Sequence, residues 1–312
     1  MKKTIWIERF ENNPLLEPDP NYPWMSKNVF NCGVVIDDED GVYKMLFRAA
    51  GTEDQSMSDC GLALSADGIK WRVQNEPVLK CGFNDHCLRG IEDPRIVKWI
   101  DGWKYIFATA YSNPSGMVGI WRTKNLLEFE WVGIPFNQED KDASIFPEPI
   151  NDWAYLLHRK PPHIWLSRTR DLTLGSGWQD SQILVEKDKF YRSPNTGNLP
   201  VRIGIAGPPI KTPKGWLVIV HVFHGQGENQ FNRVYSLGFM VLNLLDLKIE
   251  YIHPSPILWP TEKYEMVGAV PVVCFSNAIV DTGGDSLYVY WGGADTVICG
   301  GKILKEDLPM CY

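Results

Sequence analysis

Short apolar runs, each introduced by a turn residue, recur five times along the chain. They are rich in Tyr, Trp, Val, Ile and Phe, the residues that β-strands prefer. The runs occupy residues 41–49, 102–111, 152–159, 215–223 and 285–291. Because their starts lie about 50 to 70 residues apart, the pattern predicts five copies of one unit that contains several strands.

A second strand signal follows three of these runs. It consists of an apolar stretch, a Ser or Thr, a short polar turn and then a Trp, and it occupies residues 62–71, 120–131 and 164–178. The Asp67-Gly68 step in the first copy favours a hairpin turn, since Gly tolerates positive φ. The repeated unit is therefore predicted to contain at least two adjacent antiparallel strands.

Five such units, with hardly an amphipathic helix between them, predict an all-β fold, specifically a five-bladed β-propeller. A β-sandwich is the alternative, but its strands would lack the two-part repeat. No linker or low-complexity tract divides residues 1–312, so we expect a single domain. Residues 1–30, rich in Pro and Asn, are predicted to form an extended segment that lies against a blade or closes the ring.

Polar side chains stand at similar places near the ends of the repeated runs. Counting five positions from the leading aromatic residue of three runs gives Arg48, His158 and His221. Arg159 follows at once in the third run, and Asp295 comes just after the fifth. Since propellers bind ligands near the central axis, we expect these groups to converge there.

Composition narrows the class of protein. The hydrophobic content of 44% is enough for a large core, and the net charge of −7 comes without any basic run that would suit nucleic acid. No run approaches the ~18 apolar residues of a membrane span. The seven cysteines have no regular spacing and fit reduced thiols. We therefore expect a cytoplasmic protein that binds neither nucleic acid nor membranes.

Metal binding is not expected either. No CxxC pair indicates zinc, and His221 and His224, three residues apart on a predicted strand, would point to opposite faces. The sequence therefore predicts no metal and no cofactor.

The stretch Gly-Ile-Glu-Asp-Pro-Arg-Ile-Val at residues 90–97 carries the clearest chemistry. It places two adjacent carboxylates, Glu92 and Asp93, before Pro94 and Arg95. Proline pushes the residue before it towards extended geometry, so we expect Asp93 to be extended and rigid. Arg95 is positioned to orient a carboxylate by a charge-assisted hydrogen bond. Taken alone, the stretch favours a structural turn with a local ion pair, and only the accompanying motifs point to chemistry.

Together with other motifs, this stretch resembles glycoside hydrolase family 130, the β-mannoside phosphorylases and related mannosidases. The resemblance extends over nearly the whole chain, and the family fold is a five-bladed propeller. The matching motifs are Val-Phe-Asn at 29–31, Leu-Phe-Arg at 46–48, Glu-Asp-Pro-Arg at 92–95, Lys-Asp-Ala at 141–143, Phe-Pro-Glu at 146–148, Leu-His-Arg at 157–159, Arg-Ile-Gly at 202–204, Gly-Pro-Pro-Ile-Lys-Thr at 207–212, Gly-Trp-Leu at 215–217 with His221, Tyr-Glu at 264–265 with Gly268, and Tyr-Trp-Gly-Gly-Ala-Asp at 290–295.

The resemblance implies an inverting enzyme that cleaves β-mannosides with one general acid, Asp93. The resemblance further implies that this acid protonates the glycosidic oxygen through a hydroxyl of the mannosyl unit. We expect its pKa to be raised, because a general acid must hold a proton near neutral pH. Inorganic phosphate would be the nucleophile, and no cofactor is implied. The implied phosphate-binding residues are Arg48, Arg159, His221 and Tyr235, and the implied sugar-binding residues are Asn31, Asp142, Arg202 and Asp295.

The chain departs from the family pattern just before Lys141. A basic residue and an Asn are expected there, but the chain has Glu139 and Asp140. Either acid could act as a general base for water, which would make the protein a hydrolase; alternatively, both lie on a solvated loop. The retained cationic residues favour phosphorolysis.

A non-catalytic sugar-binding propeller is a further alternative for the function. The Pro-rich start could also pack against a second copy of the chain in a homo-oligomer.

Overall fold

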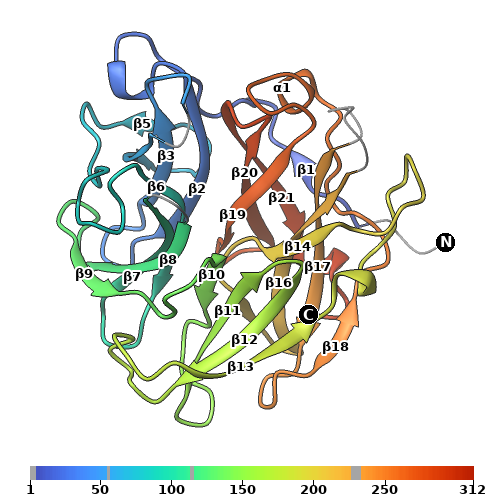
Figure 1. The fold of residues 1–312 in the computed structure, drawn as a ribbon. Helices are drawn as coiled ribbons and strands as arrows, with labels where there is room; N and C mark the ends of the chain where they lie inside the picture. The colour runs from blue at the N-terminus through green and yellow to red at the C-terminus, as the bar shows by residue number, and fades with distance from the viewer. Residues whose placement is uncertain (1–4, 55–56, 113–115, 226–232) are drawn as a thin grey trace.

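The computed structural model describes residues 5–54, 57–112, 116–225 and 233–312, and its strands form five antiparallel sheets. Figure 1 shows the sheets following one another around a ring in chain order. The predicted five-bladed β-propeller is therefore confirmed. Among the described residues, the only α-helix is the single turn α1 (Lys263–Met266).

Each blade is built from four strands, with β15 added to blade 4. Blade 1 contains β2 (Asn28–Ile36), β3 (Tyr43–Ala50), β4 (Asp59–Ser65) and β5 (Arg72–Val73). Blade 2 contains β6 (Gly90–Lys98), β7 (Lys104–Tyr111), β8 (Gly116–Thr123) and β9 (Glu130–Gly133). Blade 3 contains β10 (Lys141–Ile145), β11 (Ala154–Lys160), β12 (His163–Thr169) and β13 (Gln179–Val185).

Blades 4 and 5 complete the ring. Blade 4 contains β14 (Arg202–Ile205), β15 (Ile210–Thr212), β16 (Gly215–His224), β17 (Val234–Leu242) and β18 (Ile249–Ile252). Blade 5 contains β19 (Cys274–Asp281), β20 (Ser286–Gly293), β21 (Val297–Leu304) and, from the other end of the chain, β1 (Glu8–Arg9). Short 3₁₀ turns cover Pro23–Met25, Lys187–Lys189 and Lys305–Asp307.

The five predicted apolar runs are the second strands of the five blades, β3, β7, β11, β16 and β20. The three runs with a following Trp are the third strands β4, β8 and β12 of blades 1 to 3. Three Trp residues on second and third strands belong to the core: Trp121 of β8, Trp216 of β16 and Trp291 of β20 are fully buried. That residues 1–312 form a single domain stays a prediction.

The hydrophobic core consists of five clusters, and each is shared by two successive blades. For example, Leu46 of blade 1 packs in one cluster with Ile106 of blade 2, and Met45 of blade 1 packs in another with Tyr290 of blade 5. Each sheet therefore buries one face against each neighbour, which leaves the axis to the inner strands β2, β6, β10, β14 and β19. All seven cysteines are free thiols, as predicted.

Candidate functional site

A polar cavity of about 190 Å³ lies near the starts of the inner strands. Its walls come from all five blades, so it sits on the axis of the ring. The lining residues are Asn31, Arg48, Glu92, Asp93, Lys141, Asp142, Arg159, Arg202, Tyr235, Val273, Phe275 and Asp295. Eight of the ten residues predicted from the sequence to act in catalysis or binding are among them; His221 and Glu139 are not.

Left-handed backbone conformations direct several of these side chains into the cavity. Asn31, Asp93 and Asp142 each stand at a β-bulge of an inner strand, and their φ angles are 48°, 57° and 48°. Asp295, just after β20, has a φ of 49°. A bulge re-aims a side chain, and Asn and Asp tolerate left-handed geometry better than most residues.

Asp93 is fixed by two neighbours from blade 1. The amide of Asn31 donates to its Oδ1 at 2.9 Å, and Nη1 of Arg48 donates to the same oxygen at 3.1 Å. The expectation that Pro94 holds Asp93 extended is wrong, because the bulge between Glu92 and Arg95 places Asp93 in the left-handed region. Side-chain partners, together with the bulge, make this carboxylate rigid.

Arg95 orients a carboxylate, but not that of Asp93. Its guanidinium donates to the carbonyl oxygen of Asp93 at 2.9 Å and to Oδ1 of Asp142 at 3.3 Å. Asp142 also pairs with Nη1 of Arg159 at 3.0 Å. Because Arg95 is only 1% exposed and also bonds two carbonyls of blade 4, it ties three blades together beneath the cavity.

Glu92 and Lys141 also line the cavity. Glu92 accepts from Nη2 of Arg48 at 2.8 Å and from Nζ of Lys141 at 3.1 Å. Neither residue was among those predicted to act in catalysis or binding, although both belong to family motifs, and that membership was the available signal. Phe275 had no such signal, since it lies outside the repeated runs.

Blade 4 supplies Arg202 and Tyr235. Nε of Arg202 donates to the Tyr235 hydroxyl at 3.0 Å, and the guanidinium lies 4.4 Å from the centre of the Phe223 ring. His221 does not line the cavity. Its ring is buried behind Asp142, stacks on Phe275 at 3.8 Å and contacts the carbonyl oxygen of Ser276 through Nε2.

The electrostatics of the carboxyl groups differ from the expectation for Asp93. Burial alone raises its pKa, but Arg48, the Asn31 amide, Arg95 and Lys141 together hold the pKa of Asp93 below its usual value. Burial is likewise outweighed at Asp142, chiefly by Arg159, so its pKa is also lowered. Asp295 is the exception: burial, with Asp93 and Glu92 nearby and despite Arg48, raises its pKa to about 7.

Glu139 and Asp140, the candidate bases for hydrolysis, do not line the cavity. Glu139 is exposed to solvent, whereas Asp140 is buried and its Oδ2 lies 2.6 Å from Nδ1 of His158. His158, which the strand count predicted to be near the axis, is thereby turned into blade 3. The count is off by one position there, and Arg159 reaches the cavity instead.

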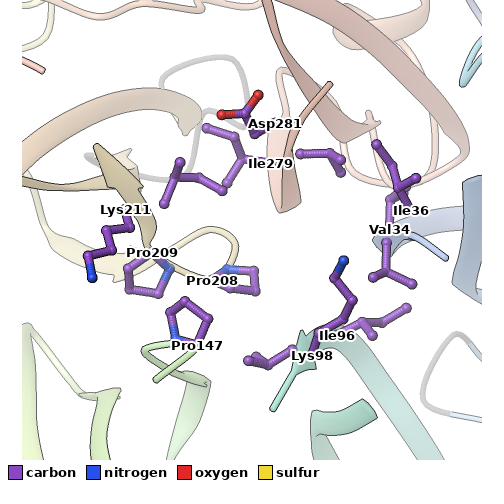
Figure 2. A pocket seen from close by; sticks show the side chains of 14 residues that line it. Val34, Ile36, Ile96, Lys98, Pro147, Pro208, Pro209, Lys211, Ile279 and Asp281 are labelled. Carbon is purple, nitrogen blue, oxygen red and sulfur yellow. The ribbon is translucent and has the colours of Figure 1, made fainter. Parts of the chain in front are cut away.

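Within the described ranges, no cluster of three or more His, Cys, Asp or Glu side chains could hold a metal ion. The same part of the chain contains no helix long and apolar enough to cross a membrane. A second cavity, of about 330 Å³, lies further along the same inner strands and is mostly apolar. Figure 2 shows its wall of Val34, Ile96, Ile279 and three prolines. Its charged lining residues are Lys98, Lys211 and Asp281, and it has no cluster of carboxylates and guanidinium groups like that of the first cavity.

A five-bladed propeller with carboxylates and guanidinium groups interleaved at its axis defines an enzyme-like site for a polar ligand. The family model for glycoside hydrolase family 130, described as beta-1,4-mannooligosaccharide phosphorylase, matches residues 6–310. The chain belongs to this family, whose members are enzymes that act on β-mannosides.

Individual relatives agree with this assignment. A 1,2-beta-oligomannan phosphorylase from Thermoanaerobacter sp. (strain X514) is 36% identical, over 97% of this chain and 99% of the relative. A beta-1,2-mannobiose phosphorylase from the same organism is 33% identical, over 97% and 98%. The solved complex of beta-1,2-mannobiose phosphorylase from Listeria innocua with beta-1,2-mannobiose matches with a TM-score of 0.80 and 26% identity, over 98% of this chain and 99% of that one.

Proposed function

We propose that the polar cavity catalyses phosphorolysis of a β-mannoside with inversion at the anomeric carbon. The observation that carries this proposal is the charge composition of the cavity wall. Four cationic side chains face four carboxyl groups: Arg48, Lys141, Arg159 and Arg202 against Glu92, Asp93, Asp142 and Asp295. Because the pKa of Asp295 is raised to about 7, below that pH the cations outnumber the carboxylates and the cavity suits an anionic co-substrate.

In this reaction a phosphate oxygen attacks C1 of the mannosyl unit from the face opposite the leaving sugar. The bond from C1 to the glycosidic oxygen breaks, and the new bond to phosphate gives α-mannose 1-phosphate. The leaving oxygen takes a proton from Asp93 through a hydroxyl of the mannosyl unit. A single protein carboxyl suffices, because phosphate replaces the water and base of an inverting hydrolase.

The lowered pKa of Asp93 is consistent with this role once phosphate is considered. In the free enzyme the field of Arg48 keeps Asp93 ionised. A phosphate bound among Arg48, Arg159 and their neighbours would offset that field and add negative charge, and both effects raise the pKa of a nearby carboxyl. Phosphate would thus help to protonate the acid as well as supply the nucleophile.

Hydrolysis with Glu139 or Asp140 as base is the second candidate, and the geometry does not favour it. Glu139 is exposed and Asp140 is engaged with His158, so neither is placed to activate a water in the cavity.

The cytoplasm stays the predicted compartment, since a phosphorylase requires a supply of inorganic phosphate.

For the linkage we propose β-1,2. The two Thermoanaerobacter relatives named above carry this linkage in their names and match over nearly the full chain, whereas the family model is described by a β-1,4 linkage. We give more weight to the relatives, because they are individual proteins of 33–36% identity whereas the model describes the family at large.

A substrate and variant assay tests this proposal. We expect turnover of β-1,2-mannobiose only with phosphate, slower turnover of the β-1,3 and β-1,4 isomers, and a loss of about 10²–10⁴-fold in kcat for Asp93→Asn. The matched change Glu139→Gln should leave turnover unaltered. Phosphate-independent release of mannose that Glu139→Gln abolishes would instead establish the hydrolase, and full activity of Asp93→Asn would exclude Asp93 as the acid.

A further inference from the structure

A chain of hydrogen bonds runs through three neighbouring segments of blade 3, outside the cavity. Oδ2 of Asp140 lies 2.6 Å from Nδ1 of His158, and Nε2 of His158 lies 2.9 Å from Oγ of Ser167. None of the three residues is more than 1% exposed. Since an ionised carboxylate can only accept, Nδ1 is the donor to Asp140, and the Ser167 hydroxyl donates to Nε2 when the ring is neutral.

This Ser–His–Asp relay has the order of a hydrolase triad but cannot work as one. The Ser167 hydroxyl is buried, and the ring of Phe136 covers the imidazole of His158 at 4.8 Å. A nucleophile must reach the substrate, and here no substrate atom could approach Oγ. The relay therefore needs another explanation.

Its place in the chain provides one. Asp140 directly precedes Lys141 and Asp142, and His158 directly precedes Arg159. Lys141 and Arg159 are register partners on β10 and β11, and Asp142 is the bulge residue that pairs with Arg159 at 3.0 Å. The relay therefore clamps together the two backbone positions from which three cavity residues project.

A backbone hydrogen bond also fixes the position of Asp140 relative to blade 2. The backbone N–H of Asp140 donates to the carbonyl oxygen of Gly116 at 3.3 Å. Asp140 thus joins the first residue of β8 to the side chain of His158 on β11. A shift of Asp140 would be passed directly to Lys141 and Asp142, because these are its next two residues in the chain.

We propose that Asp140, His158 and Ser167 form a positioning device that sets the spacing of Lys141 and Asp142 against Arg159, and thereby the site for phosphate. The inference rests on the proposed phosphorolysis. It assigns a role to the acidic residue that stands before the Lys-Asp-Ala motif. Small displacements of groups that hold a reactant reduce catalysis strongly, even when the displaced groups are not themselves altered.

Steady-state kinetics of relay variants with β-1,2-mannobiose and phosphate test the inference. We expect Asp140→Ala to lower kcat/KM for phosphate at least about tenfold, since the clamp is lost. Asp140→Asn keeps an oxygen that accepts from Nδ1, so it should retain kcat/KM within about threefold. Thr169→Val is the matched control: it removes a partly buried hydrogen bond at the end of β12, from Oγ1 to the Ser176 carbonyl oxygen at 2.8 Å, and should lower Tm without changing kcat/KM.

The double variant Asp140→Leu/His158→Leu covers the case in which Asp140→Ala does not fold. Replacing a buried polar pair by apolar residues is often neutral for stability, so this variant should fold and still lose about tenfold in kcat/KM. A folded relay variant with wild-type kcat/KM for phosphate overturns the inference alone. A wild-type enzyme that turns over without phosphate overturns the proposed function, and the inference with it.

Discussion

Four side chains of the cavity, Asn31, Asp93, Asp142 and Asp295, stand on left-handed backbone, with φ between 48° and 57°. Such positions cost free energy, of the order of 1–3 kcal/mol for strained residues and less for Asn and Asp. The cost is met by the pairing of Asp93 with Arg48 and of Asp142 with Arg159. Binding groups that are rigid before the substrate arrives lose little entropy when it binds.

The raised pKa of Asp295 predicts how the stability of the protein depends on pH. Its pKa is raised to about 7, so between about pH 4 and 7 the folded protein keeps a proton that the unfolded chain releases. The free energy of unfolding must therefore fall as pH rises through this range. Asp295→Asn removes that dependence. We expect its Tm, relative to wild type, to be higher at pH 8 than at pH 5.

Thermal unfolding of both proteins at the two pH values measures this difference. Asn tolerates the left-handed backbone at position 295, so strain should not obscure the comparison. A difference in Tm that is equal at both pH values, or larger at pH 5, would show that Asp295 does not hold a proton in the folded state.

At the scale of elements, four of the five inner strands carry a bulge, at Asn31, Asp93, Asp142 and Asn277. The inner strand of blade 4 has Gly204 in the corresponding region instead. A Cβ at Gly204 would lie 2.2 Å from Oδ2 of Asp142. The absence of a side chain at Gly204 on blade 4 therefore leaves space for the Asp142 carboxylate of blade 3.

The strands could be predicted from the sequence because a run such as Tyr43–Ala50 carries its own signal in its apolar and aromatic residues. The bulges could not, since a register shift exists only relative to a partner strand. That is why the sequence predicts an extended Asp93. The error at His158 has another cause: the count starts at Trp153, one residue before β11 begins, whereas Tyr43 is the first residue of β3. Asn31, Arg48 and Asp142 were found through the family motifs, whereas Phe275 has no local pattern that reveals it.

Gly204→Ala tests the fit between blades 3 and 4. The added methyl group must displace the Asp142 carboxylate, and it would also lie only 3.3 Å from Cδ of Arg159. We expect kcat/KM to fall at least about tenfold. Gly175→Ala, where the nearest atom is 3.7 Å away, should have wild-type kinetics. Equal kinetics for both variants would show that the Asp142 carboxylate can move without loss of activity, which would contradict the expected tight fit between blades 3 and 4.

At the scale of the whole molecule, the two ends of the chain close the ring. β1 pairs with β21, Leu16 forms a bridge to Ile298, and each hydrophobic cluster needs two blades. The seam is also held by Arg9, which contacts the fully buried carboxylate of Glu265 at 2.9 and 2.8 Å. The axis then carries a polar cavity near one end and an apolar one further along (Figure 2).

Arg9→Ala should destabilise the protein by about 2–3 kcal/mol, because it leaves a buried carboxylate without its cation. Lys302→Ala is the control: its partner Glu8 is exposed and 3.4 Å away, so the loss should be within about 1 kcal/mol. Urea unfolding measures both values. Equal losses for the two variants would show that the Arg9–Glu265 pair does not hold the seam.

The anomeric configuration of the first product tests the proposed phosphorolysis most directly. β-1,2-Mannobiose and inorganic phosphate are mixed with the enzyme, and the reaction is followed by ¹H and ³¹P NMR. Inverting phosphorolysis predicts α-mannose 1-phosphate as the first mannosyl product, formed in step with the loss of phosphate. Free mannose formed at the same rate with and without phosphate, or a β-configured phosphate ester, would contradict it.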